Sequence, residues 1–75
     1  MKLSELQPGV CGRVTSVGGD AAFQRRITAV GLTQGSNVKV MRNEKHFPLL
    51  LFARNTVLAV NRKECEEIEI EVADK

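Results

Sequence analysis

The chain has 75 residues and contains no tryptophan, no tyrosine, one histidine and two cysteines. Because His46 is the only imidazole and no serine lies in a nucleophile motif, the sequence offers no catalytic pair of nucleophile and base. The aromatic residues are three phenylalanines, which leaves few platforms on which nucleic-acid bases could stack. These shortages argue against an enzyme and against a nucleic-acid partner.

Long apolar runs are also missing. The longest one, 48–53, is far too short to cross a bilayer, and the N-terminus lacks the basic, apolar and small-residue order of a secretory signal. We therefore expect a cytoplasmic protein without direct membrane insertion. A chain of this length has room for one domain with a small core, which we expect to span 1–75.

The charges are unevenly placed, although the net charge is only +2. Up to Arg54 the chain has eight Lys or Arg and three acidic residues, whereas from Asn55 onward it has three Lys or Arg and six acidic residues. A basic region and an acidic edge suit the orientation of a protein partner better than the coating of a polyanion.

One short helix is predicted between two glycines. Asp20 is a suitable N-cap, and Phe23, Ile27 and Val30 recur at helical spacing on one face. Gly31 can adopt the left-handed conformation that ends a helix. The sequence therefore predicts a helix that begins after Asp20 and ends at Gly31.

The remaining patterns predict strands. Residues 68–72 alternate isoleucine or valine with glutamate, and Leu49 to Arg54 is apolar on both faces, as in a central, well-covered strand with Phe52 in the core. Asn55 suits a tight turn between two hairpin strands. The expected strands are 10–17, 38–42, 49–54, 57–60 and 68–72. The fold class is therefore mainly β, a small SH3-like barrel of about five strands with one short α-helix inserted after the first long strand.

The spacing of several residues resembles that of a known family. Arg25-Arg26-Ile27, Gly31-Leu32, Gly35, Val38 and Val40 are similar to the signature of the FeoA family, and Pro8-Gly9 and 58–62 resemble its opening and closing segments. The resemblance covers nearly the whole chain. It implies that the chain is a cytosolic, non-enzymatic protein that accompanies the bacterial ferrous iron transporter. It also implies that the chain has no cofactor of its own.

The resemblance also implies a partner, which is the cytosolic side of that transporter and its GTPase domain. The chain departs from the family at His46-Phe47, where a Gly-Asp pair commonly precedes the proline of a hairpin.

Two alternative functions stay open. One is a stand-alone metal-sensing or assembly module similar to the C-terminal SH3-like domain of iron-dependent repressors, and the other is a small RNA-binding barrel. The oligomeric state, including weak self-association, also stays open.

Cys11, His46 and Cys65 are the candidate metal ligands. Their side chains suit zinc or iron, and the family implies an association with transition metal ions. However, the three residues are scattered along the chain and form no CxxC motif. We therefore expect two reduced, mostly buried structural thiols.

Arg25, Arg26 and Leu32 are the candidate partner-binding residues. The two arginines are expected on the outer side of the helix, and Leu32 is expected to be exposed or half-exposed after the glycine. Arginine beside an apolar anchor is typical of protein interfaces. In the competing interpretation, Arg26 packs along the barrel wall and Leu32 serves only to cap the helix.

Overall fold

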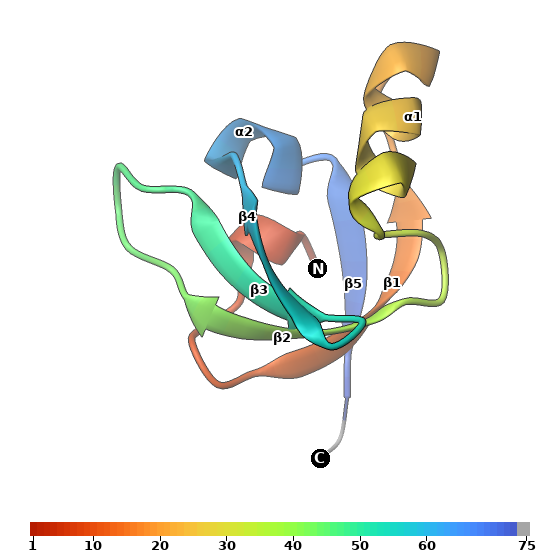
Figure 1. Cartoon of the computed structure of the whole chain (residues 1–75). Coiled ribbons are helices and arrows are strands. Elements are labelled where there is room, and N and C mark those ends of the chain that lie inside the picture. The colour runs from red at the N-terminus through yellow and green to blue at the C-terminus, as the bar shows by residue number, and fades with distance from the viewer. Residues whose placement is uncertain (74–75) are drawn as a thin grey trace.

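A computed structural model describes residues 1–73 of the chain (Figure 1). One helix follows the first strand, as predicted, and a helical turn precedes the last strand. The elements are η1 (Leu3–Glu5), β1 (Cys11–Val17), α1 (Ala21–Val30), β2 (Asn37–Arg42), β3 (Leu49–Ala53), β4 (Thr56–Val60), α2 (Arg62–Cys65) and β5 (Ile68–Val72).

The five strands form one antiparallel sheet in the order β4-β3-β2-β1-β5. The sheet is strongly curled, and η1 lies on its inner side (Figure 1). Two hairpins join β2 to β3 and β3 to β4, as predicted. The second hairpin turns through Arg54 and Asn55, whose φ angles of 54° and 66° confirm the tight turn expected at Asn55. The order leaves β4 and β5 as the two edge strands.

Both ends of α1 form as the sequence predicts. The Asp20 carboxylate accepts a hydrogen bond of 2.9 Å from the Phe23 N–H, which satisfies one of the free donors of the first turn. Gly31 has a φ of 108°, and its N–H donates to the carbonyls of the last turn. The Leu32 N–H also donates to the Ile27 carbonyl, at 3.1 Å, so the chain folds back over the helix end.

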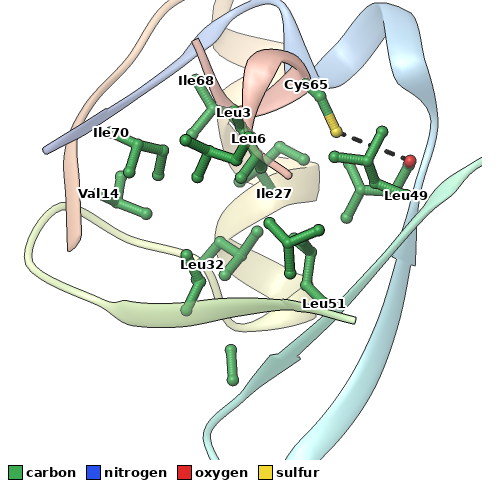
Figure 2. Packing of buried hydrophobic residues seen from close by; sticks show 14 of the residues in the cluster. Leu3, Leu6, Val14, Ile27, Leu32, Leu49, Leu51, Cys65, Ile68 and Ile70 are labelled. Atoms are coloured by element: carbon green, nitrogen blue, oxygen red, sulfur yellow. Dashed lines mark hydrogen bonds between the residues drawn. The ribbon is translucent and has the colours of Figure 1, made fainter. Parts of the chain in front are cut away.

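A single apolar core fills the inside of the sheet (Figure 2). All of its members are buried, and they come from every strand, from η1, α1 and α2, and from the segments that follow η1 and α1. The cluster is Leu3, Leu6, Val14, Phe23, Ile27, Leu32, Val38, Val40, Leu49, Leu51, Ala53, Val60, Cys65, Ile68 and Ile70. The strand alternation therefore predicted most of the core.

Two apolar residues were wrongly expected in the core. Val30, in the last turn of α1, is 43% exposed, so the buried stripe of the helix consists of Phe23 and Ile27 alone. Phe52 is 40% exposed, because β3 is covered on its inner face only and Phe52 lies on the outer one. The prediction of a strand covered on both faces is therefore wrong for β3.

Gly12 in β1 allows two strands to approach closely. It is buried and lies opposite Val72 of β5, and a Cβ atom there would collide with the Ile70 side chain. A side chain at this position would also come within 3.0 Å of the Glu71 carbonyl oxygen. The contact between β1 and β5 therefore depends on this glycine.

Candidate functional site

The outer face of α1 is the largest exposed helical surface of the described chain. Eight of its ten residues are exposed, because only Phe23 and Ile27 reach the core. Ala21, Arg25 and Ala29 follow one another at a spacing of four and therefore lie in a line along the helix. The small alanine side chains leave a shallow hollow, whose lining residues are Ala21, Gln24, Arg25, Thr28 and Ala29.

Arg25 is the charged group of this hollow. Its side chain is exposed and, within residues 1–73, forms no ion pair and donates no hydrogen bond. The guanidinium therefore has all its donors available in a fixed, planar arrangement that suits carboxylates of a partner. This finding agrees with the exposed position expected for Arg25.

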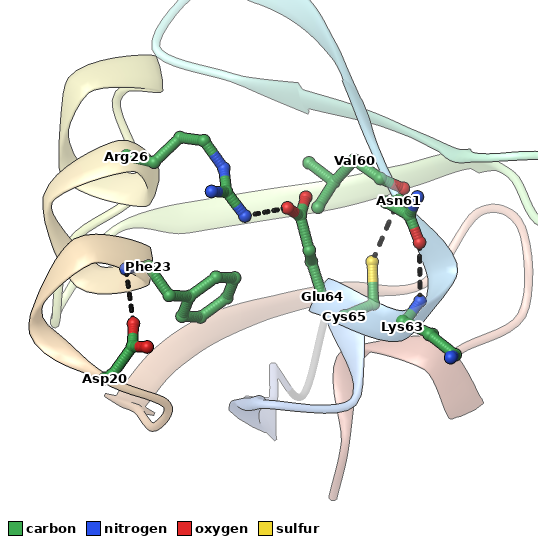
Figure 3. Close-up of polar contacts among 8 residues, drawn as sticks. All are labelled: Asp20, Phe23, Arg26, Val60, Asn61, Lys63, Glu64 and Cys65. Atoms are coloured by element: carbon green, nitrogen blue, oxygen red, sulfur yellow. Dashed lines mark hydrogen bonds and ion pairs between the residues drawn. The ribbon is translucent and has the colours of Figure 1, made fainter.

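Arg26 is in a different situation. Its guanidinium forms an ion pair with the Glu64 carboxylate of α2 and lies 5.5 Å from the centroid of the Phe23 ring (Figure 3). The cation above the ring and the ion pair both stabilise the contact between the two helices. Arg26 therefore contacts α2 and the Phe23 ring rather than the barrel wall, and its side chain is 57% exposed, in agreement with the outer position expected for it.

Leu32 is not exposed, which corrects the expectation. Its exposed fraction is 0%, and it lies in the core cluster beside Ile27 and Leu51 (Figure 2). The cause is the left-handed turn at Gly31, which directs the chain back under the helix. Leu32 offers no surface to a partner, so the candidate docking surface consists of the outer face of α1 with Arg25 as its charged group.

The two cysteines differ in their surroundings. Cys65 is fully buried, and its thiol donates to the Val60 carbonyl at 3.7 Å (Figure 3). Burial raises the pKa of this thiol to about 12, so it is neutral at physiological pH. Cys11, by contrast, is exposed on β1, so the expectation of a buried thiol is wrong there. Its side chain points to the outer face of the sheet.

The candidate metal ligands do not fit a shared metal site. Within residues 1–73, no three His, Cys, Asp or Glu side chains lie together in a way that could hold a metal ion. His46 belongs to the loop between β2 and β3, where its φ is 72°. A neutral buried thiol is also a poor ligand, since metals bind the thiolate.

A polar network that the sequence did not predict holds this loop in place. The Arg62 guanidinium donates to the Asn43 side-chain oxygen at 2.6 Å and to the Glu44 carbonyl at 3.1 Å. The Asn43 amide in turn donates to the Leu6 carbonyl at 2.7 Å. These residues are far apart in the sequence and belong to no local motif. The network links α2 and the residues after η1 to the hairpin that carries His46.

The helices of residues 1–73 are all too short, or not apolar enough, to span a membrane.

Comparisons with known proteins agree on the family. Residues 1–72 match the FeoA domain. The solution structure of FeoA from Chlorobium tepidum is 36% identical over 96% of this chain and 70% of that chain, with a TM-score of 0.86. FeoA from Stenotrophomonas maltophilia in complex with zinc, described as a prokaryotic SH3 domain protein, is 26% identical over 95% of this chain and 89% of that chain, with a TM-score of 0.79. No curated protein sequence gives a significant match.

A likeness to metal-dependent repressors is limited to the fold. A manganese-dependent transcriptional repressor in complex with manganese has a TM-score of 0.91, at 13% identity, over 97% of this chain and 36% of that chain. The barrel with its inserted helix is therefore shared between the two groups of proteins. The match of residues 1–72 and the likeness to solved FeoA structures place the chain in the FeoA family, whose members are non-enzymatic accessory proteins of ferrous iron transport.

Proposed function

We propose that this protein regulates ferrous iron uptake by docking to the cytosolic side of the ferrous iron transporter, including its GTPase domain, through the outer face of α1. The observation that carries the proposal is the exposed helix, in which Arg25 stands free between two alanines. Family membership supports the transporter as the partner.

The outer face of α1 has the shape and charge that such a contact requires. Ala21 and Ala29 allow another helix or strand to approach closely, and Arg25 supplies a cation between them. An arginine that becomes buried at the centre of an interface often accounts for much of the binding free energy. Docking then requires no chemistry from this chain. It favours the transporter conformation that presents the matching surface.

Binding of the purified full-length protein to the purified GTPase domain of the transporter tests the proposal. Arg25→Glu should weaken binding by about 1–3 kcal/mol, as expected for a lost arginine anchor. Lys45→Glu is the matched control, because it makes the same change of charge at an exposed residue of the loop between β2 and β3. The control should bind like the parent protein.

The choice of Arg25 alone avoids a change of fold. Arg26→Glu would place a second carboxylate beside Glu64 and repel α2, so a loss of binding could then come from disturbed packing. Equal binding of Arg25→Glu and the parent protein would contradict docking through α1. Equal weakening by Arg25→Glu and Lys45→Glu would show that net charge alone matters.

A further inference from the structure

The edge strand β4 lacks the features by which edge strands avoid pairing with other chains. It contains no charged residue, no proline and no bulge, and it pairs with β3 in an unbroken register. The strand consists of Thr56, Val57, Leu58, Ala59 and Val60. The first four are exposed or half-exposed, and the strand is rich in β-branched side chains, which favour strands.

The free side of β4 also offers backbone hydrogen-bonding groups. In an antiparallel ladder, every second residue of an edge strand points its N–H and C=O away from the neighbouring strand. Within residues 1–73, no backbone group of β4 forms a backbone hydrogen bond outside the ladder with β3. β4 runs from the hairpin turn to α2 (Figure 1), and among the described residues it pairs with β3 alone.

The other edge of the sheet is protected. The Ile70 N–H of β5 donates to the Met1 carbonyl at 2.7 Å, and Lys2 forms a β-bridge with Glu69. β5 also exposes Glu71 and has an irregular register with β1. In residues 1–73, Met1 and Lys2 thus cover part of the β5 edge, whereas no segment pairs with the free side of β4.

The charges around β4 indicate which charge an added strand should carry. Arg54 precedes β4, Lys63 follows it within one helical turn, and Lys39 lies two strands away on the outer face, opposite Phe52. Within residues 1–73, none of these three cations forms an ion pair. Arg54 therefore lies at the start of the uncharged strand, and Lys63 lies just beyond its end in a turn that also carries Arg62 and Glu64.

A row of outward-facing side chains runs from β4 across the sheet and includes one cation, Lys39. Val57 lies opposite Phe52, Phe52 opposite Lys39, and Lys39 opposite Cys11, so the four side chains form one row over four strands. Val57 is 56% exposed, and a shallow groove follows part of the row past Cys11 and Phe52. An apolar side chain of an added strand would extend the row beside Val57.

We propose that β4 binds an extended protein segment with an apolar, alternating centre and acidic residues at both ends, by adding it as a sixth strand. The backbone of the segment pairs with β4, which supplies affinity, and its carboxylates lie near Arg54 and Lys63. This inference does not depend on docking of the transporter to α1, because no residue that lines the hollow of α1 belongs to β4 or to the cations beside it.

The same charges disfavour a second copy of this chain as the strand that pairs with β4. Antiparallel pairing of two β4 strands would bring Arg54 of one copy toward Lys63 of the other, and parallel pairing would bring the two Arg54 side chains together. The acidic strand β5 is held within the fold and its edge is occupied by Met1 and Lys2.

The test uses the full-length protein and a short fluorescent peptide whose centre alternates valine and threonine and whose ends carry glutamates. Fluorescence anisotropy should show saturable binding, and the amide hydrogens of β4 should exchange more slowly when the peptide is bound. Val57→Lys should weaken binding at least about tenfold, because lysine on an edge strand disfavours pairing. Met41→Lys is the matched control, since Met41 is 49% exposed on β2, and it should bind like the parent.

Modified peptides test the mode of binding. Two peptides are N-methylated at alternate residues. Methylation of the amides that point toward β4 should abolish binding, whereas methylation of the amides that point away should preserve it. A third peptide, with lysines in place of the glutamates, should bind more weakly. Equal binding of both methylated peptides, or equal binding of Val57→Lys and the parent, would overturn the inference. A dimer that Val57→Lys disrupts and that the peptide does not displace would assign β4 to a second copy and overturn the proposed occupant.

Discussion

Arg26 of α1 and Glu64 of α2 form an ion pair above the ring of Phe23. The two residues are 38 positions apart in the sequence, and the pair joins the only two α-helices of residues 1–73. It therefore links α1 to α2, whereas Arg25 at the preceding position forms no ion pair within residues 1–73. Neighbouring arginines of one helix thus have different surroundings.

A double-mutant cycle should detect this pair. Arg26→Ala and Glu64→Ala should each destabilise the fold, with a coupling free energy of about 0.5–1 kcal/mol, because the Arg26 side chain is largely exposed and water screens the attraction. Urea unfolding gives the four free energies. Strict additivity of the two changes would mean that the pair does not contribute to stability.

Gly31 should tolerate asparagine better than valine. Its φ of 108° is unfavourable for any side chain with a Cβ, and most of all for a branched one. We expect Gly31→Val to lower the free energy of unfolding by about 1–2 kcal/mol and Gly31→Asn to lower it by less. Equal stability of the valine variant and the parent in urea unfolding would contradict a left-handed residue at the end of α1.

The buried thiol of Cys65 should make stability depend on alkaline pH. Burial raises its pKa from the ordinary 9.0 to about 12, so the folded state keeps the proton longer than the unfolded state. This contribution is complete below pH 9 and declines between pH 9 and about 12, by up to ~1.4 kcal/mol per pH unit. Cys65→Ala should lose stability less steeply over this range, and parallel curves for the two proteins would contradict the raised pKa.

The scattered metal-ligand candidates predict that the protein has no tight metal site built from its cysteines. Calorimetric titration with zinc or ferrous ion under reducing conditions should give the same weak heats for the parent and for a variant with Cys11→Ala and Cys65→Ala. Cys11 is exposed, Cys65 is buried, and neither belongs to a ligand cluster within residues 1–73. Stoichiometric binding that disappears in the double variant would instead favour the metal-sensing interpretation.

The elements that could be predicted from the sequence depend on local chemistry. Asp20 and Gly31 define the bounds of α1 through hydrogen bonds to the helix itself, and Asn55 supports a positive φ within its own turn. The alternation of Ile68 and Ile70 with glutamates likewise identifies the inner face of β5. Each of these signals lies within a few residues of the structure that it determines.

The errors concern burial, which depends on parts of the chain that lie far apart. Phe52 is as apolar as Phe23, but no element of residues 1–73 covers the outer face of β3 at this residue. Leu32 is buried because the turn at Gly31 directs it inward. The ion pair of Arg26 with Glu64 joins residues 38 positions apart, so no local pattern indicates it. The exposure of Arg25 could therefore be predicted from the sequence, whereas the burial of Leu32 and the ion pair of Arg26 could not.

Mapping of the interface by NMR tests the central claim, which is docking through the outer face of α1. Titration of the isotope-labelled full-length protein with the unlabelled GTPase domain of the ferrous iron transporter should shift or broaden the amide signals of Ala21, Arg25 and Ala29 most strongly. Arg25→Glu should remove these changes, whereas Lys45→Glu should keep them. Changes that leave α1 untouched and gather instead on β4 or β5 would contradict the proposed docking surface.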